Sequence, residues 1–324
     1  MKCFTPAPRL GHPGTWRSAA LRSRAGGLFL ALGLAGCLAR PPAGPRAVVF
    51  QTDFGLKDGA VAAMKGVATG VDPSLRLHDL TQEIPPFHIW EAAYRLKQTF
   101  AYWPPGTVFV SVVDPGVGTE RRPVVARLRT GQWVVTPDNG TLTFLAESPG
   151  IESLRVIDMA RHRLPGSADS YTFHGRDLFA YVAARLAAGK LSWAGVGEPA
   201  ATPAVRLPYQ AAELRDGVLL GTVPVLDIQY GNVWSNIPGR RLAELGVKPG
   251  DSAEVTFRQA GREVWRGTLP LVTTFGAVPA GQPLLFVNSL LDVAVALNQD
   301  SFAARHGIGS GPDWTLEVRP APRP

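Results

Sequence analysis

The chain has 324 residues, of which 45% are hydrophobic and 18% charged, so a disordered protein is excluded and about two domains with a sizeable core are expected. Its 35 Gly and 29 Pro indicate many turns, and because they show no three-residue period, collagen is excluded. The formal charge of +7 would suggest an acidic partner such as nucleic acid if it lay on the folded part. Residues 1–36 contain five basic side chains and no acidic one, however, so the remainder carries only about +2.

The N-terminal segment has the three parts of a secretory signal peptide. A basic stretch ends at Arg24, residues 26–35 are apolar, and small residues follow them. The apolar run is far shorter than the ~20 residues that a membrane-spanning helix needs. The sequence Leu34-Ala-Gly-Cys37 at its end resembles a bacterial lipobox, in which the Cys is lipidated and becomes the mature N-terminus.

These features predict a lipoprotein signal peptide at residues 1–36, lipidation of Cys37 and a Pro-rich tether at 37–46. The protein is then exported and anchored to a bacterial membrane, at the periplasmic face or the cell surface. An ordinary secretion signal followed by a chance Cys is the alternative. The only other Cys is Cys3, so the folded part has no thiol for a disulfide, a zinc site or a nucleophile.

From residue 47, short apolar runs alternate with amphipathic stretches, a pattern that predicts an α/β domain with a mostly parallel sheet over residues 47–205. Buried strands are expected at 47–51, 75–80 and 107–113. The apolar faces of two expected helices consist of Ile89, Ala93, Leu96 and Phe100, and of Leu178, Tyr181, Val182 and Leu186, with Gly189 after the second.

The amino-acid composition changes near residue 200, where a Pro-rich polar stretch, 198–216, is typical of a linker. Beyond it, short strand-like pieces separated by turn residues predict a smaller β-barrel or sandwich domain over 215–324. The expected strands are 218–226, 253–257, 263–266, 283–287 and 314–318, and the one expected helix is 291–304.

Polar clusters follow several expected strands, at the edge where ligands bind in open α/β sheets. They are Thr52-Asp-Phe-Gly55, the segment 114–121 and the segment 136–140, and a further cluster, 172–177, precedes a helix. Ordinary turn chemistry is the alternative for Pro137-Asp-Asn-Gly, and a purely structural His is the alternative for His174. In the second domain, 227–236 is equally compatible with a turn beside a core Trp, and Asn288-Ser289 is ambiguous.

Several common active sites are excluded by spacing. The segment from Asp114 has no Gly-Lys-Ser/Thr ending, so it is not a P-loop, and Asp53-Phe-Gly has no other kinase motif beside it. None of the six His residues has metalloprotease spacing, and no Gly-x-Ser-x-Gly elbow occurs.

Taken together and in order, these motifs resemble those of the S-adenosyl-L-methionine (SAM) hydroxide adenosyltransferases, relatives of the adenosyl-fluoride and adenosyl-chloride synthases. The resemblance covers roughly residues 47–318. It implies an N-terminal α/β domain, a C-terminal β-barrel and a homotrimer whose sites lie between the N-terminal domain of one subunit and the C-terminal domain of its neighbour. The implied reaction is attack of water or hydroxide at the ribose 5′ carbon of SAM, which gives adenosine and L-methionine.

Carried over position by position, the family's catalytic set falls on Asp114, Arg121 and His174. In the halogenases other residues occupy the Asp and His positions, so the presence of all three here favours water over halide as the nucleophile. Asp114 and His174 are then candidates to accept the proton of the water, while Arg121 holds the set and stabilises the developing hydroxide.

The positions that match the family's substrate-binding residues imply contacts with every part of SAM. They are Asp53 for the ribose hydroxyls, Phe87 beside the sugar, Asp227, Asn232 and Ser289 for the methionine amino and carboxylate groups, Tyr230 and Trp234 as walls, and Leu297 with Asn298 for adenine. The chain departs from the family pattern at Gln229-Tyr230 and at Leu290-Leu291, which affects the details of the methionine and adenine contacts.

The resemblance implies no cofactor, since SAM is the substrate and its sulfonium is already an activated leaving group that needs no metal. The expected partner is this small molecule, with no nucleic acid and with membrane contact only through the lipid anchor. Alternatives are a periplasmic, lipid-anchored protein that binds a nucleoside or adenosyl ligand without turnover, a halide adenosyltransferase, and a metal hydrolase that uses Asp53, Asp114, Asp138 and His174.

Overall fold

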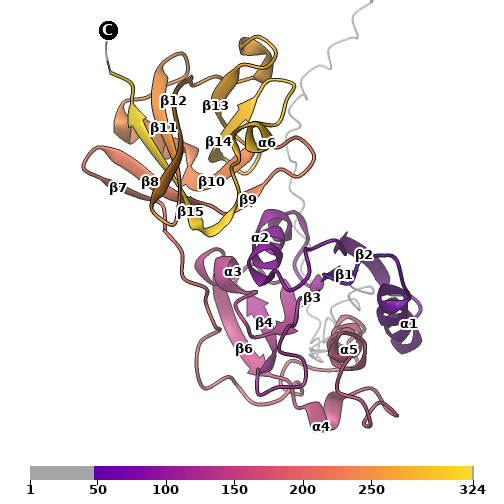
Figure 1. The fold of residues 1–324 in the computed structure, drawn as a ribbon. Helices are drawn as coiled ribbons and strands as arrows, with labels where there is room; N and C mark the ends of the chain where they lie inside the picture. The colour runs from indigo at the N-terminus through magenta and orange to yellow at the C-terminus, as the bar shows by residue number, and fades with distance from the viewer. Residues whose placement is uncertain (1–46, 323–324) are drawn as a thin grey trace, which may run out of the picture. The chain divides into compact units, whose positions relative to one another are not determined.

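The computed structural model describes residues 47–322, and Figure 1 shows their course. The predicted signal peptide, the predicted lipidation site Cys37 and the predicted tether lie outside the described residues. Within the described part, no helix is both long enough and apolar enough to cross a membrane.

The first region is built on a six-stranded, mostly parallel sheet, which confirms the predicted fold class. Its strand order is β2-β1-β3-β5-β4-β6, and only β4 runs against its neighbours. All residues of β1 and β3 are buried because helices cover both faces of the sheet. The strands are β1 (Ala47–Thr52), β2 (Arg76–Thr81), β3 (Val108–Val112), β4 (Pro123–Leu128), β5 (Trp133–Pro137) and β6 (Ile151–Val156).

Helices pack on both faces of this sheet. On one face, α1, η2 and α5 share a core with the strands that includes Met64 and Phe179; on the other, α2 contributes Leu96. The helix expected around 178–186 is divided into a π-helical turn, η2, and the α-helix α5, and Gly189 just beyond it has a positive φ of 70°. The helices are α1 (Ala60–Val71), α2 (Ile89–Thr99), η1 (Phe100–Tyr102), α3 (Thr143–Glu147), α4 (Met159–His162), η2 (Gly175–Ala180) and α5 (Tyr181–Ala187).

The second region consists of two antiparallel sheets, with strand orders β12-β11-β15-β8-β7 and β13-β14-β10-β9. Both sheets contribute to one hydrophobic core, for example through Val255 of the first and Val293 of the second. The strands are β7 (Glu213–Arg215), β8 (Val218–Val223), β9 (Val225–Leu226), β10 (Val233–Pro238), β11 (Ser252–Gln259), β12 (Arg262–Pro270), β13 (Pro283–Val287), β14 (Asp292–Leu297) and β15 (Gly311–Pro320); the short helices are η3 (Gly239–Leu245), η4 (Phe275–Ala277) and α6 (Phe302–His306).

The helix predicted over 291–304 is wrong. Residues Asp292–Leu297 form β14, which pairs with β10 and β13, and only Phe302–His306 are helical. Every residue of β14 is buried, so its sequence lacks the alternation that marks a half-exposed strand. Periodicity alone cannot distinguish such a run from a buried helix.

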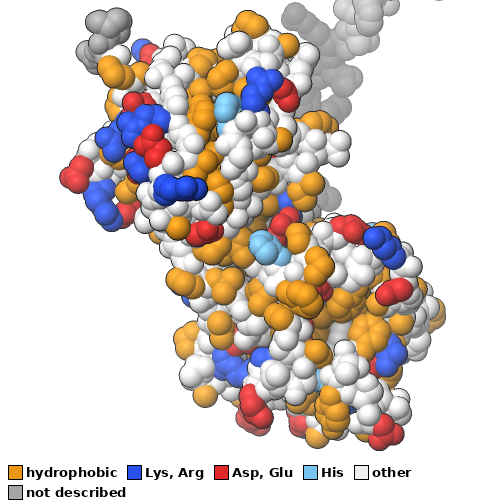
Figure 2. Space-filling model, viewed as in Figure 1, with side chains coloured by type: hydrophobic (Ala, Val, Ile, Leu, Met, Phe, Trp, Pro, Cys, Tyr) orange, Lys and Arg blue, Asp and Glu red, His pale blue; other side chains and the backbone are white. Residues whose placement is uncertain are grey.

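Charged side chains of both signs are mixed over β11, β12 and β15 on the face that Figure 2 shows. Arg258 contacts Glu317 and Glu263, and Arg266 contacts Glu254 and Glu263. This part of the surface is therefore a network of paired charges, which does not offer the single-sign basic patch that nucleic acid prefers.

Candidate active site

Two of the predicted carboxylates follow neighbouring parallel strands of the six-stranded sheet. Asp53 comes directly after β1, and Asp114 comes shortly after β3. Because the carboxyl ends of parallel strands share one edge of the sheet, both side chains line one cavity of about 230 Å³, the strand-end cavity. Its other lining residues are Phe54, Pro86, Phe87, Val112, Val117, Thr172, Phe173, His174 and Gly175.

Arg121 joins Asp114 to His174, so the structure brings the three predicted catalytic residues together. Its Nε lies 3.0 Å from both carboxylate oxygens of Asp114, and its Nη2 lies 2.5 Å from Oδ2. The same Nη2 lies 2.8 Å from Nδ1 of His174. The side chains of Asp114 and Arg121 are only 5% and 9% exposed, and charge-assisted hydrogen bonds at such sites are strong and directional.

The contact with Arg121 fixes the tautomer of His174. A guanidinium can only donate hydrogen bonds, so Nδ1 is the acceptor and the ring proton of the neutral imidazole is on Nε2. This Nε2 and Nη1 of Arg121 are buried and have no hydrogen-bond partner within residues 47–322. Two N–H donors, Nη1 of Arg121 and Nε2 of His174, are therefore available for a ligand. His174 also lines the strand-end cavity.

Burial and neighbouring cations keep His174 neutral. Burial of the ring lowers the pKa of His174 below its ordinary value of 6.5, and the positive charges of Arg121 and Arg163 lower it further. Asp114 and Asp177 act in the opposite direction, but more weakly. A neutral ring is the form in which Nδ1 accepts from Arg121.

The π-helical turn η2 positions His174, which precedes its first residue. A Cβ at Gly175 would lie 3.1 Å from the ring of Phe54 and 3.3 Å from that of Phe173, so the backbone passes close to two residues of the cavity. Asp177 in this turn is fully buried and pairs with Arg176. The polar cluster 172–177 is thus divided between the cavity and a structural ion pair.

Asp53 holds a strained residue at the rim of the same cavity. Its Oδ2 accepts a hydrogen bond from the backbone N–H of Phe87 at 2.8 Å. Phe87 has a φ of 66°, which a bulky residue rarely adopts, and its side chain is 71% exposed. The strain fixes an exposed aromatic ring beside Asp53, as expected for a residue that packs against a ligand.

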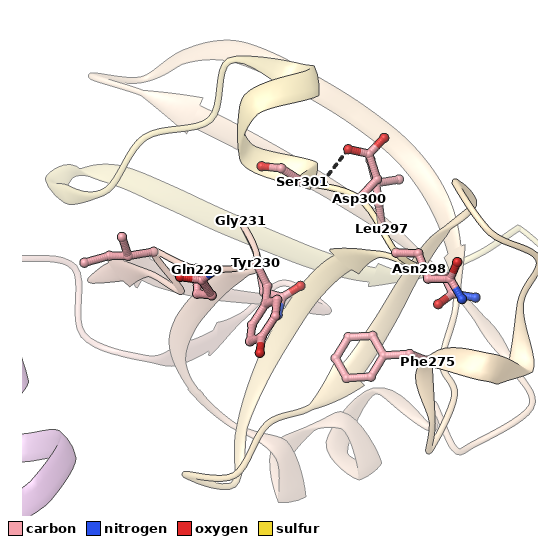
Figure 3. A pocket seen from close by; sticks show the side chains of 11 residues that line it. Gln229, Tyr230, Gly231, Phe275, Leu297, Asn298, Asp300 and Ser301 are labelled. Carbon is pink, nitrogen blue, oxygen red and sulfur yellow. Dashed lines mark hydrogen bonds between the residues drawn. The ribbon is translucent and has the colours of Figure 1, made fainter.

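A second and larger cavity, the turn cavity, lies in the C-terminal region and has a volume of about 610 Å³ (Figure 3). It contains four of the predicted binding residues and two residues that were not predicted, Phe275 and Ser301. The lining residues are Ile228, Gln229, Tyr230, Gly231, Asn232, Phe275, Leu297, Asn298, Gln299, Asp300 and Ser301. No local motif marks Phe275, which reaches this cavity through η4, where its ring packs against Phe286 of β13.

The turn after β9 is held by its own hydrogen bonds. Asp227 and Asn232 bond through both backbone and side chains, with Nδ2 of Asn232 donating to Oδ2 of Asp227 at 3.0 Å. A Cβ at Gly231 would collide with Ser301, so only glycine lets the turn pack against α6. Tyr230, at the tip, is 67% exposed and faces the cavity in Figure 3.

Three predicted binding residues have other surroundings. Asp227 lines a smaller cavity that shares Gly231 with the turn cavity. Ser289 is an exposed turn residue between β13 and β14 that lines none of these three cavities. Trp234 is only 9% exposed and packs with Trp90, Phe144 and other apolar residues where the two regions of the chain meet. The predicted wall is therefore part of a core.

Asp138 does not join the other carboxylates. It is 5% exposed, forms an ion pair with Arg122 and accepts a hydrogen bond from the backbone of Val205. Among the residues that the structure describes, no group of three His, Cys, Asp or Glu is placed to hold a metal ion. Asp138 instead fastens the linker to the first region.

The strand-end cavity, with its buried carboxylate, guanidinium and neutral imidazole, defines an α/β enzyme that acts on a small molecule. The comparisons with known proteins give the family. The chain matches the family model described as the SAM hydroxide adenosyltransferase N-terminal domain over residues 48–197 and the corresponding C-terminal domain over residues 221–315. It belongs to this family.

Relatives agree over most of the chain. It is 38% identical over 271 residues to an (R)-S-adenosyl-L-methionine hydrolase of Thermus thermophilus, an alignment of 82% of this chain and 96% of the relative. Identity to a protein of the same name from Salinispora tropica is 37%, over 82% of this chain and 95% of that one. A crystal structure of an uncharacterized conserved protein from Thermotoga maritima matches with a TM-score of 0.76 and 32% identity, over 84% of this chain and 99% of that one.

Proposed function

We propose that this chain hydrolyses SAM to adenosine and L-methionine by attack of water at the ribose 5′ carbon. The observation that carries the proposal is the buried Asp114–Arg121–His174 set at the strand-end cavity. The names of the relatives that align over most of the chain support the same reaction.

The hydrogen bonds of Arg121 indicate different roles for His174 and Asp114 in the reaction. In the reaction, the new C–O bond forms from a water lone pair, the C–S bond electrons leave with the methionine sulfur, and one proton is released. His174 Nε2 would donate a hydrogen bond to the water oxygen, because Nδ1 already accepts from Arg121. That leaves Asp114 as the acceptor for a water hydrogen, and thus as the group that orients the water and receives the proton.

The remaining residues would bind the substrate. The carboxylate of Asp53, next to the exposed ring of Phe87, suits the two ribose hydroxyls. Asp227, Asn232 and Ser289 would take the amino and carboxylate groups of methionine, and the strand end at Leu297 and Asn298 would take adenine. No cofactor or metal is required, because the sulfonium leaves without protonation.

The two cavities share no lining residue, although a SAM molecule needs both sets of contacts. Each cavity is bordered by strongly exposed apolar side chains, with Phe87 at one and Ile228 and Tyr230 at the other. Such apolar borders are typical of subunit interfaces. These features support a site in which the strand-end cavity of one subunit is completed by the turn cavity of its neighbour, and the family resemblance implies that the assembly is a homotrimer.

We further propose that the chain is an exported lipoprotein, anchored through Cys37 and the tether at 37–46, with its membrane contact confined to this anchor. The leader sequence described above supports this assignment. Incorporation of labelled fatty acid into the wild-type chain, but not into Cys37→Ser, would establish it. Equal labelling of both chains would contradict it.

The reaction is tested by incubating the detergent-solubilised full chain with SAM and chloride and separating the products by chromatography. Adenosine and methionine in equal amounts are expected, with no loss of rate after addition of a chelator. Formation of 5′-chloro-5′-deoxyadenosine would show a halide adenosyltransferase. Binding of SAM without any product would show a binding protein, and inhibition by the chelator would show a metal hydrolase.

A further inference from the structure

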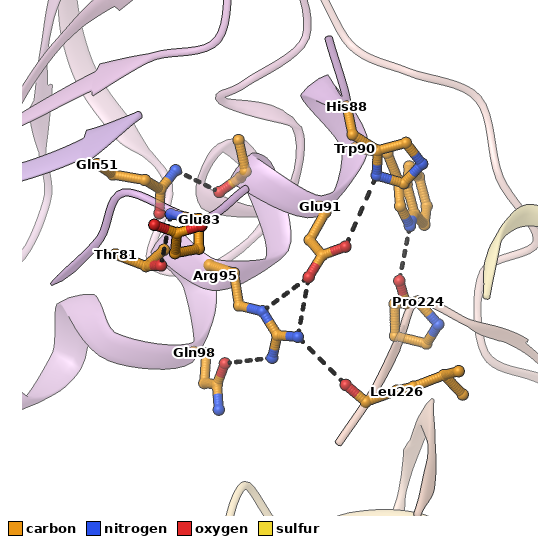
Figure 4. A network of polar contacts seen from close by, with 11 residues as sticks. Gln51, Thr81, Glu83, His88, Trp90, Glu91, Arg95, Gln98, Pro224 and Leu226 are labelled. Carbon is orange, nitrogen blue, oxygen red and sulfur yellow. Dashed lines mark hydrogen bonds and ion pairs between the residues drawn. The ribbon is translucent and has the colours of Figure 1, made fainter. Parts of the chain in front are cut away.

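Helix α2 links a residue of the strand-end cavity to the strand that precedes the turn of residues 227–232. It begins at Ile89, two residues after Phe87 of the strand-end cavity, and His88 is its N-cap residue. Farther along, its side chains reach the short strand β9, which ends directly before Asp227 (Figure 4). The helix is therefore in a position to determine where the turn of residues 227–232 lies.

Arg95 makes the most extensive of these contacts. Its Nη2 donates to the backbone carbonyl of Leu226 at 3.2 Å and to Oε1 of Glu91 at 2.9 Å, and Nε also donates to this oxygen at 3.2 Å. Its Nη1 donates to Oε1 of Gln98 at 3.0 Å. Two residues of its own helix, Glu91 and Gln98, therefore orient the guanidinium group toward β9.

Burial strengthens the hydrogen bonds of Arg95 and so fixes the position of its guanidinium group. The side chains of Arg95 and Glu91 are each only 12% exposed, so water competes weakly for their hydrogen bonds. Exposed ion pairs commonly contribute little, but a guanidinium with four bonds in a buried site fixes the atoms it contacts.

The strand that receives this contact is short. Strand β9 has only two residues, Val225 and Leu226, and pairs with β10 alone. Its second anchor to α2 is the hydrogen bond from Nε1 of Trp90 to the carbonyl of Pro224, at 2.8 Å. Trp90 holds the beginning of the strand and Arg95 its end, so Arg95 acts on the residue next to Asp227.

We propose that Arg95 is a positioning residue for methionine binding. By holding the carbonyl of Leu226, it sets the place of the Asp227–Asn232 turn, whose side chains meet the methionine end of SAM. The inference rests on the proposed function. It assigns Arg95 to substrate recognition and not to the chemical step, because its contacts are with β9 and its own helix.

The experiment compares wild type, Arg95→Gln and Arg95→Lys as full chains, with SAM turnover and product inhibition as readouts. For Arg95→Gln we expect KM for SAM and the inhibition constant of methionine to rise about tenfold, with kcat within twofold. The inhibition constant of adenosine should stay within twofold. Arg95→Lys keeps a donor at this position and should fall between wild type and Arg95→Gln.

Arg206→Gln is the matched control, since Arg206 pairs with Glu147 and fastens the linker without touching the turn. It should leave all four constants unchanged. Equal constants for wild type and Arg95→Gln would overturn the inference, as would parallel weakening of methionine and adenosine, which would indicate general loss of structure. If Arg95→Gln does not fold, Arg95→Lys decides by the same criteria. Absence of turnover in the wild type would instead refute the proposed function.

Discussion

The two cavities of this chain are built in different ways. The strand-end cavity is lined by Asp114 and His174, which are both bonded to the buried guanidinium of Arg121. The turn cavity is larger and is shaped mainly by backbone turns and exposed rings such as Tyr230 and Phe275. Side chains held in fixed positions, as in the strand-end cavity, are suited to stabilising a reacting centre. The open turn cavity is suited to binding the substrate, and a second protein surface is needed to close it.

This contrast predicts that damage to the strand-end cavity reduces turnover, whereas damage to the turn cavity reduces affinity. His174→Ala or Asp114→Ala should lower kcat by about a hundredfold or more, because each removes a group that orients the water or takes its proton. The release of adenosine under saturating SAM measures this effect. Wild-type kcat in either variant would remove that residue from the chemical step.

Mixing two variants tests whether the cavities of different subunits combine, and SAM is kept far below KM so that each variant alone has little activity. His174→Ala damages the strand-end cavity and Asp227→Ala damages the turn beside the turn cavity, so a mixed trimer contains some sites with two intact halves. After denaturation and joint refolding in equal amounts, about one quarter of wild-type activity should return if subunits mix at random. If each site lay within one chain, activity would not exceed the mean of the separate variants.

Asp227→Asn should raise KM for SAM about tenfold and leave kcat within twofold, since a neutral amide weakens a charge-assisted bond to the methionine amino group. Steady-state kinetics over a range of SAM concentrations gives both constants. A fall of kcat with unchanged KM would place Asp227 in the chemical step and weaken the contrast between the cavities.

The acidic limb of the kcat profile should have its midpoint below pH 6.5, because burial and nearby cations lower the pKa of His174. Protonation at low pH removes the acceptor at Nδ1, so activity falls as the pH falls. Arg163→Gln removes one of these cations and should shift the midpoint to higher pH. An unchanged midpoint would exclude an influence of Arg163 on the titrating group.

The same shift has a definite sign for stability. Between the folded pKa and the ordinary value of 6.5, the unfolded chain binds more protons at His174, so the free energy of unfolding decreases as the pH falls through this interval. Denaturant titrations of wild type and His174→Gln above and below pH 6.5 should show a larger acid-induced loss in the wild type.

The smallest effect is expected at Trp234. Because it packs in a core with Trp90 and Phe144, Trp234→Phe should reduce the free energy of unfolding by about 1–3 kcal/mol and change KM by less than twofold. Denaturant unfolding and steady-state kinetics measure the two quantities. A KM increase of tenfold would return Trp234 to the role of a cavity wall.

Much of the candidate site was accessible to sequence reasoning because parallel strands place their carboxyl ends together. Asp53 and Asp114 could be assigned to one edge of the sheet from the strand pattern alone. The contact of Arg121 with His174, which are separated by 53 residues, could not, since it depends on how η2 packs against the sheet. The tautomer of His174 follows only from that contact.

The C-terminal region was harder to predict from local patterns. The fully buried strand β14 has no alternation, so local periodicity predicts a helix there. The motif around Trp234 does not show that its ring packs among apolar residues. Phe275 carries no motif, and it lines a cavity only because η4 lies near the Tyr230 turn.

The sequence by itself determined the alternation of strands and helices, the polar residues at the strand ends, the family, and the concentration of positive charge in residues 1–36. These are properties of neighbouring residues and of their order. The tertiary structure alone decided that Arg121 bonds His174 and that Arg95 bonds the carbonyl before Asp227. Contacts between segments far apart in the chain depend on packing, which local sequence patterns do not encode.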